Sequence, residues 1–318
     1  MTTQNDPEDS PRMQPELRKP WLIAVWPGMG GVAQIAGTYL ARQLGAEPVA
    51  ELDPRGFFDV QSVAVKGGLV QSGGLPRSVF YAWRHPGEGR DLLLLLGERQ
   101  PSAESARYSQ ALLEIAEKYG VERVFTFAAM ATPIHPTAAP RVFAVASGAE
   151  LLPELLRDGV TLLDDGEITG LNGVFIGVAA SRGLPSVCLL GEFPFFAAPV
   201  PNPKASAAVL KVFSALSGVE IDLSEILADA RKIEQGLSQH LEGLQRAAEL
   251  AAPSFESPEG ASEGDEGPSK EVLERIERLF AQARSDRSKA LELKAELDRQ
   301  GLFRDYEDRF LDLFKQAG

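Results

Sequence analysis

Several short segments of the chain are apolar throughout instead of alternating between apolar and polar residues. A strand with this pattern has to be covered on both of its faces. Helical patterns separate most of these segments, and such alternation indicates a mostly parallel sheet. The sequence therefore predicts an α/β fold, a three-layer α/β/α sandwich. Its predicted strands span 21–26, 47–53, 78–84, 91–97, 123–129, 141–147 and 186–192, and its predicted helices span 31–45, 102–120, 172–183 and 202–218.

Composition divides the chain into five predicted parts. Residues 1–19 are polar and rich in proline, which is typical of a disordered tail. Residues 20–220 form the α/β domain, and 221–250 form a long amphipathic helix. Residues 251–269 are acidic and rich in Gly, Ser and Pro, as flexible linkers are. Residues 270–318 form a helical unit whose two apolar stripes require burial in its own core or against another subunit.

Residues 54–90 interrupt the alternation of strands and helices. They contain turn residues every few positions and no helical stripe. This pattern predicts short strands and hairpins inserted at one edge of the sheet.

Bulk composition excludes several kinds of partner. The net charge is −13, which argues against binding to nucleic acid or to an anionic membrane surface. No segment approaches the roughly 18 apolar residues of a membrane span, and the N-terminal segment lacks the apolar core of a signal peptide. We therefore expect a cytoplasmic protein. The single cysteine, Cys188, lies in an apolar run and is expected to be a small buried hydrophobe.

The glycine-rich turn at 27–31 connects the first predicted strand to the first helix. Gly28 and Gly30 fit the dinucleotide fingerprint, and Glu51 and Asp53 lie where an acid would bind a ribose. However, the second strand leads into hairpins instead of a crossover helix, and no Gly-Lys-Ser/Thr follows the turn. We favour a structural turn, with an NAD site or another anion at the helix N-terminus as alternatives, and predict no cofactor.

Two predicted strands end in Leu-Gly-Glu, which places Glu98 and Glu192 at the strand ends where open α/β sheets bind ligands. These carboxylates either form a pair for metal or acid–base chemistry or accept backbone N–H groups in local turns. We favour the second interpretation. The sequence has no clustered Cys and His residues that would predict a metal site, and no G-x-S-x-G motif that would predict a serine hydrolase. We predict no catalytic residue. The speculative ligand-binding set is Gly28, Met29, Gly30, Gly31, Glu98, Thr132, His135, Asn172, which is also a candidate helix cap, and Glu192.

The order of several segments resembles the PAC2 family, which is named after a proteasome assembly chaperone. The matching segments include WPGMGGVAQIAGTYLARQLGAEPVAELDP (26–54), LLLLLGERQP (92–101), ITGLNGVFIGVAASRGLPSVCLLGE (168–192), PNPKASAAVLKVF (201–213) and ELKAELDRQGLFRDYEDRFLDLF (292–314). The resemblance implies a sandwich similar to nucleoside phosphorylases without their catalytic set. It also implies homo-oligomers or heterodimers, and a chaperone role toward proteasome subunits in eukaryotic and archaeal members.

The resemblance favours a non-catalytic chaperone-like or scaffold protein whose partners are its own copies and another protein. The alternative is a small-molecule or nucleotide-binding enzyme, similar to a carboxylate-amine ligase or a phosphorylase, that uses the crevice at the strand ends. The ligase label of some bacterial-looking members finds no ATP-binding lysine and metal-acid arrangement here. Family chaperones that dock on proteasome rings end in hydrophobic-Tyr-any residue. This sequence ends in Gln316-Ala317-Gly318, so that docking mode is not expected.

Overall fold

The computed structural model describes residues 16–60, 63–71, 73–157, 159–251, 270–285 and 289–300, and positions 302, 303, 306, 309, 310 and 313. The chain divides into two compact units, Met1–Gln239 and His240–Gly318. Most of the predicted N-terminal tail and almost all of the predicted 251–269 linker lie outside the described residues.

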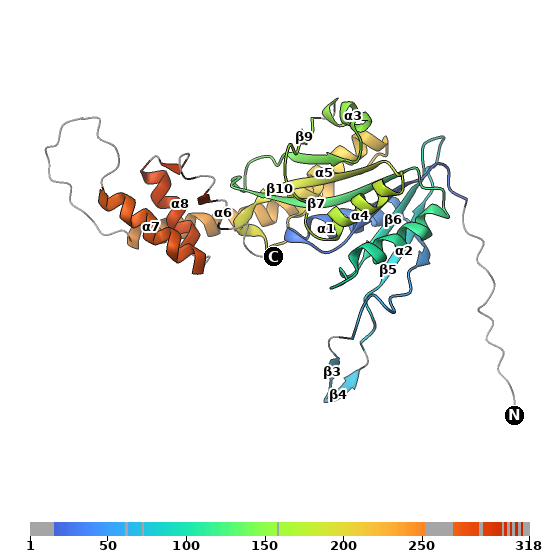
Figure 1. The fold of residues 1–318 in the computed structure, drawn as a ribbon, viewed down its shortest axis with the longest axis horizontal. Coiled ribbons are helices and arrows are strands. Elements are labelled where there is room, and N and C mark those ends of the chain that lie inside the picture. The colour runs from blue at the N-terminus through green and yellow to red at the C-terminus, as the bar shows by residue number, and fades with distance from the viewer. Residues whose placement is uncertain are drawn as a thin grey trace. The chain divides into compact units, whose positions relative to one another are not determined.

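An eight-stranded sheet forms the centre of the first unit (Figure 1). Its strand order is β2-β5-β6-β1-β7-β10-β8-β9. The four central strands β6, β1, β7 and β10 are parallel, whereas β2, β5 and β8 join antiparallel at the two sides. The strands are β1 Trp21–Val25, β2 Glu47–Glu51, β5 Ser78–Trp83, β6 Leu92–Gly97, β7 Arg123–Thr132, β8 Val142–Ala146, β9 Thr161–Leu162 and β10 Ser186–Pro194.

Helices cover both faces of the sheet and create two separate cores. On one face, Ile23 and Val25 of β1 pack in a cluster with α1 (Val32–Leu44), α5 (Pro203–Ser217) and the start of α6 (Ser224–Ala251). On the other face, Leu22 and Ala24 pack with α2 (Ser105–Glu117) and α4 (Leu171–Ser181). β1 is buried along its whole length, as its apolar sequence predicts. The three-layer sandwich is confirmed.

Two short elements were not predicted from the sequence. β9 has only two residues, and α3 (Leu152–Arg157) has six. Neither is long enough to show a period of 2 or 3.6 residues. The sheet is mostly but not wholly parallel, since the pairs β2–β5, β5–β6 and β8–β10 run antiparallel.

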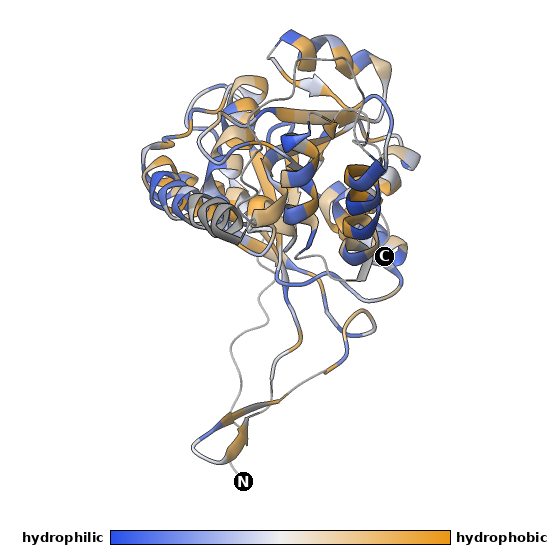
Figure 2. Cartoon of the chain, turned by 90° about the vertical axis from the view of Figure 1, so that its left-hand side faces the viewer, coloured by the Kyte–Doolittle hydropathy of each residue, from blue (hydrophilic) through white to orange (hydrophobic). Residues whose placement is uncertain are grey.

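The 54–90 insertion contains a small hairpin with its own two-stranded sheet, β3 (Ala64–Lys66) paired with β4 (Leu69–Gln71). The two residues between the strands are Gly67 and Gly68, whose φ angles are 59° and 79°. Positive φ at both central positions matches a type I′ hairpin turn. The hairpin stands away from the eight-stranded sheet in both ribbon views (Figures 1 and 2).

The second unit has a core of its own. α7 (Lys270–Ser285) and α8 (Ala290–Arg299) pack together with apolar residues from the following segment. The two predicted stripes therefore meet each other, and among their residues that the structure describes only Leu273 is markedly exposed, at 36%. The members of the cluster that are almost fully buried are Ile276, Phe280, Ala283, Ala290, Leu293, Leu297 and Phe310.

Gly37 allows α1 to approach the sheet closely. A Cβ atom at this position would overlap the side chain of Val25 and lie 3.2 Å from Cδ2 of Leu96. A residue inside the first helix, Gly37, therefore makes a close contact with the sheet. At the glycine-rich turn before it, Gly30 and Gly31 instead adopt left-handed φ angles.

We expect Gly37→Ala to lower the free energy of unfolding by about 1–3 kcal/mol, the usual cost of overpacking a core. Gly177 is the matched control, because it lies exposed in α4 and its Cβ would meet nothing within 4 Å. Gly177→Ala should raise the free energy of unfolding by up to about 1 kcal/mol through helix propensity. Urea unfolding of both variants measures this, and equal effects of the same sign would contradict the packing argument.

Candidate functional site

The turn after β1 uses its backbone amides for internal hydrogen bonds. Gly30 N–H donates to the carbonyl of Ala198 (2.9 Å), and Gly31 N–H donates to the carbonyl of Gly28 (3.0 Å). Asn202 N–H donates to the carbonyl of Gly30 (2.7 Å). A phosphate bound at this turn would have to compete with these carbonyl groups for the N–H donors. Met29, between the glycines, leaves its side chain 50% exposed.

Asn202 links this turn to helix α5. Its Oδ1 accepts a hydrogen bond from Ala205 N–H (3.0 Å), and Pro203 occupies the first helical position. Asn202 thus caps this helix. Asn202 is 5% exposed, and its Cβ would lie 3.3 Å from a Cβ placed on Gly30. The two residues are therefore fitted against each other.

Gln100, just beyond β6, connects the glycine turn to helix α4. Its Nε2 donates to the carbonyl of Pro27 (2.8 Å), and its Oε1 accepts from Leu171 N–H (2.9 Å). The N-cap of α4 is Gly170, so the expectation that Asn172 caps this helix is wrong. Asn172 lies inside the helix, 7% exposed, and its Oδ1 has no hydrogen-bond partner. The Gln100 amide instead accepts the N–H of Leu171, the first residue of the helix.

Glu98 and Glu192 each accept a backbone N–H group. Glu98 accepts from Arg77 N–H and Glu192 from Arg141 N–H, both at 2.9 Å. Their strands, β6 and β10, are separated by β1 and β7, which places them three strand spacings, or about 14 Å, apart. The structure does not bring the two carboxylates together as a pair.

Glu192 is the most buried carboxylate at this end of the sheet, at 2% exposure. It also binds Arg141 Nε (3.0 Å) and accepts from Thr132 Oγ1 (2.8 Å). Burial by itself raises the pKa of Glu192, but the bonds from Arg141 and Thr132 outweigh it, so the pKa lies below its ordinary value. Glu192 is thus held as a carboxylate by a local network.

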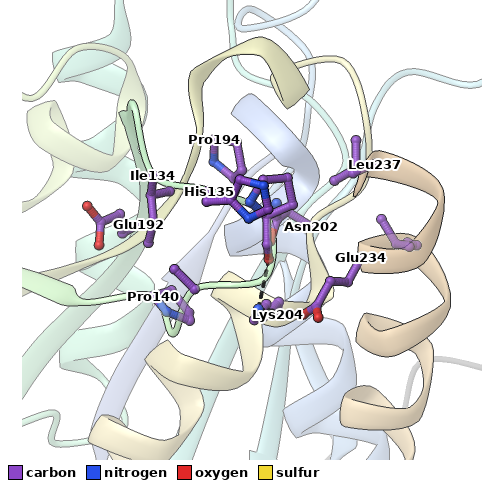
Figure 3. Close-up of a pocket in the computed structure, with 12 residues that line it drawn as sticks. Ile134, His135, Pro140, Glu192, Pro194, Asn202, Lys204, Glu234 and Leu237 are labelled. Carbon is purple, nitrogen blue, oxygen red and sulfur yellow. Dashed lines mark hydrogen bonds and ion pairs between the residues drawn. The ribbon is translucent and has the colours of Figure 1, made fainter. Parts of the chain in front are cut away.

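A small cavity lies beside Glu192, between the 132–140 segment and helices α5 and α6 (Figure 3). Lys204 Nζ donates to the carbonyl of Pro136 (2.8 Å) and pairs with Glu234 of α6. Figure 3 shows the Glu192 carboxylate pointing away from this pair. The cavity volume is about 20 Å³, which is room for roughly one water molecule. A nucleotide does not fit this cavity.

His135, which also lines this cavity, is exposed. Its Nδ1 lies 2.8 Å from Thr137 Oγ1, at hydrogen-bond distance.

The two acids considered for a ribose site are each bound to an arginine. Glu51 pairs with Arg77 and Asp53 with Arg55, at 2.6 Å in both cases. A ligand that binds either acid would have to compete with its arginine.

Sequence reasoning missed the partners that make these contacts, namely Gln100, Arg141 and Glu234. Gln100 is 73 residues from Pro27 and 71 from Leu171, and Arg141 is 51 residues from Glu192. Lys204 lies at the start of the helix predicted over 202–218, and this was the one available signal. The other contacts follow only from the strand order.

The described part of the chain offers no further candidate for a metal site and no membrane span. Among these residues, no group of three or more His, Cys, Asp or Glu side chains could hold a metal ion. No helix there has the length and apolar character needed to cross a membrane. Cys188 is fully buried, and burial raises its pKa to about 12, so its thiol is not reactive near neutral pH.

The fold and the site define this chain as an α/β/α sandwich protein in which the polar groups at the ends of the central strands bind mainly one another. The chain belongs to the PAC2 family, whose family model matches residues 22–241, more than half of the chain.

Similar proteins are found among archaea. The uncharacterized protein MJ1210 of Methanocaldococcus jannaschii is 26% identical over 246 residues, which cover 76% of this chain and 91% of that protein. The crystal structure of Pyrococcus furiosus PbaB, an archaeal proteasome activator, aligns with a TM-score of 0.61 and 25% identity over 71% of this chain and 94% of PbaB. Pyrococcus furiosus PbaA, an archaeal homolog of proteasome-assembly chaperone, aligns with a TM-score of 0.57 and 25% identity over 74% of this chain and 93% of PbaA.

We expect Asn202→Ala to lower the free energy of unfolding by about 1 kcal/mol, the typical loss of a helix cap. Asn202→Ser is the control, because serine caps helices about as well as asparagine. Chemical denaturation of both variants measures the difference. If the alanine and serine variants were equally stable, the cap would not be the stabilising contact.

We expect Glu192→Gln to lower the free energy of unfolding by about 1.5–3 kcal/mol at neutral pH, as for hydrogen bonds to a charged group. The folded pKa lies below the ordinary value of 4.5. The ionised form therefore contributes its full stability above about pH 4.5, and this contribution is lost as the pH falls through the folded pKa. The difference between wild type and variant should shrink accordingly in urea unfolding at stepwise lower pH.

Glu51→Gln is the control for this measurement, because its ion pair with Arg77 is largely exposed. Exposed pairs contribute at most about 1 kcal/mol, so this variant should differ little from wild type at any pH. A pH-independent deficit in Glu192→Gln would show that the carboxylate charge is not what stabilises this position.

Proposed function

We propose that the protein is a cytoplasmic, chaperone-like protein of the PAC2 family that acts without catalysis. It works through contacts with its own copies and with another protein during assembly. The observation that carries this proposal is the state of the ends of the central strands. There the Gly30 amide, the Leu171 amide and the Glu192 carboxylate already have partners within the chain.

The size of the neighbouring cavity supports the same proposal. A small-molecule site normally occupies several hundred cubic ångströms, whereas the cavity beside Glu192 measures about 20 Å³. The polar side chains around it are engaged as well, since Lys204 binds Glu234 and the Pro136 carbonyl. An enzyme similar to a carboxylate-amine ligase or a phosphorylase would have to open this region to admit its substrate.

Two of the similar proteins support the chaperone-like part of the proposal. PbaB is described as an archaeal proteasome activator and PbaA as a homolog of proteasome-assembly chaperone. Both share the fold of this chain over most of their own length. These likenesses support protein partners for this chain, and the proposal extends them to self-association.

Two measurements on the full chain test the proposal. Light scattering coupled to size-exclusion chromatography should give a mass greater than that of one chain. Thermal unfolding with nucleotides, inorganic phosphate or nicotinamide cofactors should show no stabilisation, because a ligand at a hundredfold excess over its Kd would add about 2.7 kcal/mol. Saturable stabilisation by one of these compounds would instead support the enzyme alternative, and a monomer at all concentrations would remove self-association from the proposal.

A further inference from the structure

We infer that the loop between β5 and β6 is a pH-sensitive switch controlled by His85. The imidazole ring of His85 holds residues 86–90 in place only in its neutral form, so this part of the loop opens when the ring binds a proton. The switch lies outside the candidate site described above, and it does not depend on the proposed self-association.

Two backbone amides of the loop point at one nitrogen of the ring. Gly87 N–H donates to Nδ1 of His85 at 3.0 Å, and Gly89 N–H donates to the same atom at 3.2 Å. A ring nitrogen that accepts a hydrogen bond carries no hydrogen of its own, and a neutral imidazole has one such nitrogen. The folded loop therefore fixes His85 as the neutral tautomer whose hydrogen is on Nε2.

The ring is also the surface against which the loop packs. A Cβ atom placed on Gly89 would overlap Cδ2 and Nε2 of His85, so the backbone at this position lies directly against the ring. A Cβ atom placed on Gly87 would be in ordinary contact with the ring, at 3.6 Å. The ring is edge-on to Trp83, with 5.4 Å between the two centroids. His85 thus supplies both a hydrogen-bond acceptor and a packing surface to the loop.

The backbone of His85 is anchored separately from its ring. Asp91, which is 1% exposed, accepts the N–H of His85 at 2.8 Å and the N–H of Arg18 at 2.7 Å. The guanidinium of Arg18 donates to the carbonyl of His85 at 2.8 Å and lies 3.5 Å from the Asp91 carboxylate. These opposite charges offset each other. Because they bind the backbone of His85, they hold this end of the loop whether or not the ring is charged.

The other charged residues of the loop are directed elsewhere. Arg84 and Glu88 are exposed, and the guanidinium of Arg90 lies over the ring of Trp21, 4.0 Å from its centroid, and 3.6 Å from the carboxylate of Glu122. Among the described residues, no carboxylate forms an ion pair with the ring of His85. A charged ring would therefore gain no partner in exchange for the two amides that it loses.

Proton binding and the two amide hydrogen bonds exclude each other. A proton taken from solvent by Nδ1 would face the hydrogens of the Gly87 and Gly89 amides, and both bonds would have to break. Histidine changes its charge between about pH 5 and 8, and the closed loop accepts only the neutral ring. The loop is therefore closed at the upper end of this range and opens as the pH falls through it.

Nuclear magnetic resonance of the full chain, labelled with nitrogen-15 in glycine and histidine, tests the switch. At about pH 7.5 the ring of His85 should show the neutral form with hydrogen on Nε2. On acidification, the Gly87 and Gly89 amide protons should shift toward the positions of unbonded amides, with the same midpoint as the ring nitrogens of His85. The Gly45 amide, which donates to carbonyls at the end of α1, should not follow this transition.

Two variants of His85 separate the proton from the acceptor. His85→Asn retains a side-chain acceptor for an N–H two residues ahead but does not titrate. Its Gly87 and Gly89 amides should therefore stay bonded over the whole pH range. His85→Ala removes the acceptor, so both amides should have the shifts of the open loop at every pH.

Two variants of the glycines test the packing against the ring. Gly89→Ala places a Cβ where the ring lies, so the Gly87 amide should be unbonded already at about pH 7.5. Gly87→Ala is the matched control, because its Cβ has room beside the ring. The Gly89 amide of this variant should keep the transition of the wild type.

His135 is the control histidine, since its Nδ1 also accepts an N–H two residues ahead, from Thr137 at 3.3 Å. His135→Asn should leave the transition at Gly87 and Gly89 unchanged. The inference is overturned if the ring of His85 carries hydrogen on Nδ1 in the neutral form, or if both amides keep their shifts while the ring becomes charged. It is also overturned if His85→Asn shows the wild-type transition. Each of these outcomes leaves the proposed function as it stands.

Discussion

Two backbone hydrogen bonds join the turn after β1 to the segment before α5, and the α/β unit depends on this connection. Gly30 both donates to Ala198 and accepts from Asn202, although the two partners lie about half the chain away. Buried backbone groups have to be paired, and here each segment satisfies the other. Asn202 then begins α5 by capping it. One contact thus closes the turn and orients a helix of the core at the same time.

How much of this could be predicted depends on the distance over which each feature is encoded. The strands buried on both faces are visible locally, because their segments are apolar throughout, and so the sandwich could be predicted. The cap at Asn202 is also local, since Pro203 follows it directly. The partners of Glu192 and Leu171 are Arg141 and Gln100, and these depend on strand order, which periodicity does not reveal. The prediction that Asn172 caps α4 was wrong for a similar reason. The cap position is Gly170, and the distant Gln100 side chain accepts the N–H of Leu171.

The ends of the central strands illustrate why a motif is not yet a site. The glycine turn matches a nucleotide-binding pattern in sequence, but binding needs free N–H donors directed at the ligand. In this fold the donors of Gly30 and Gly31 point at carbonyl groups of the chain itself. Likewise, Glu192 is buried next to Arg141 and Thr132, which satisfy its charge. These internal hydrogen bonds stabilise the end of the sheet and leave few free polar groups for a small ligand to bind.

The burial of apolar side chains distinguishes the second unit from the β3–β4 hairpin. The helices α7 and α8 bury Phe280 and Leu293 in a shared core, so the described apolar residues of the second unit largely cover one another. The β3–β4 hairpin has no such core, and Leu69 and Val70 remain in contact with water. Exposed apolar area of this kind costs free energy unless another surface covers it. Most of the strongly exposed large apolar residues of the described chain therefore lie in the insertion between β2 and β5.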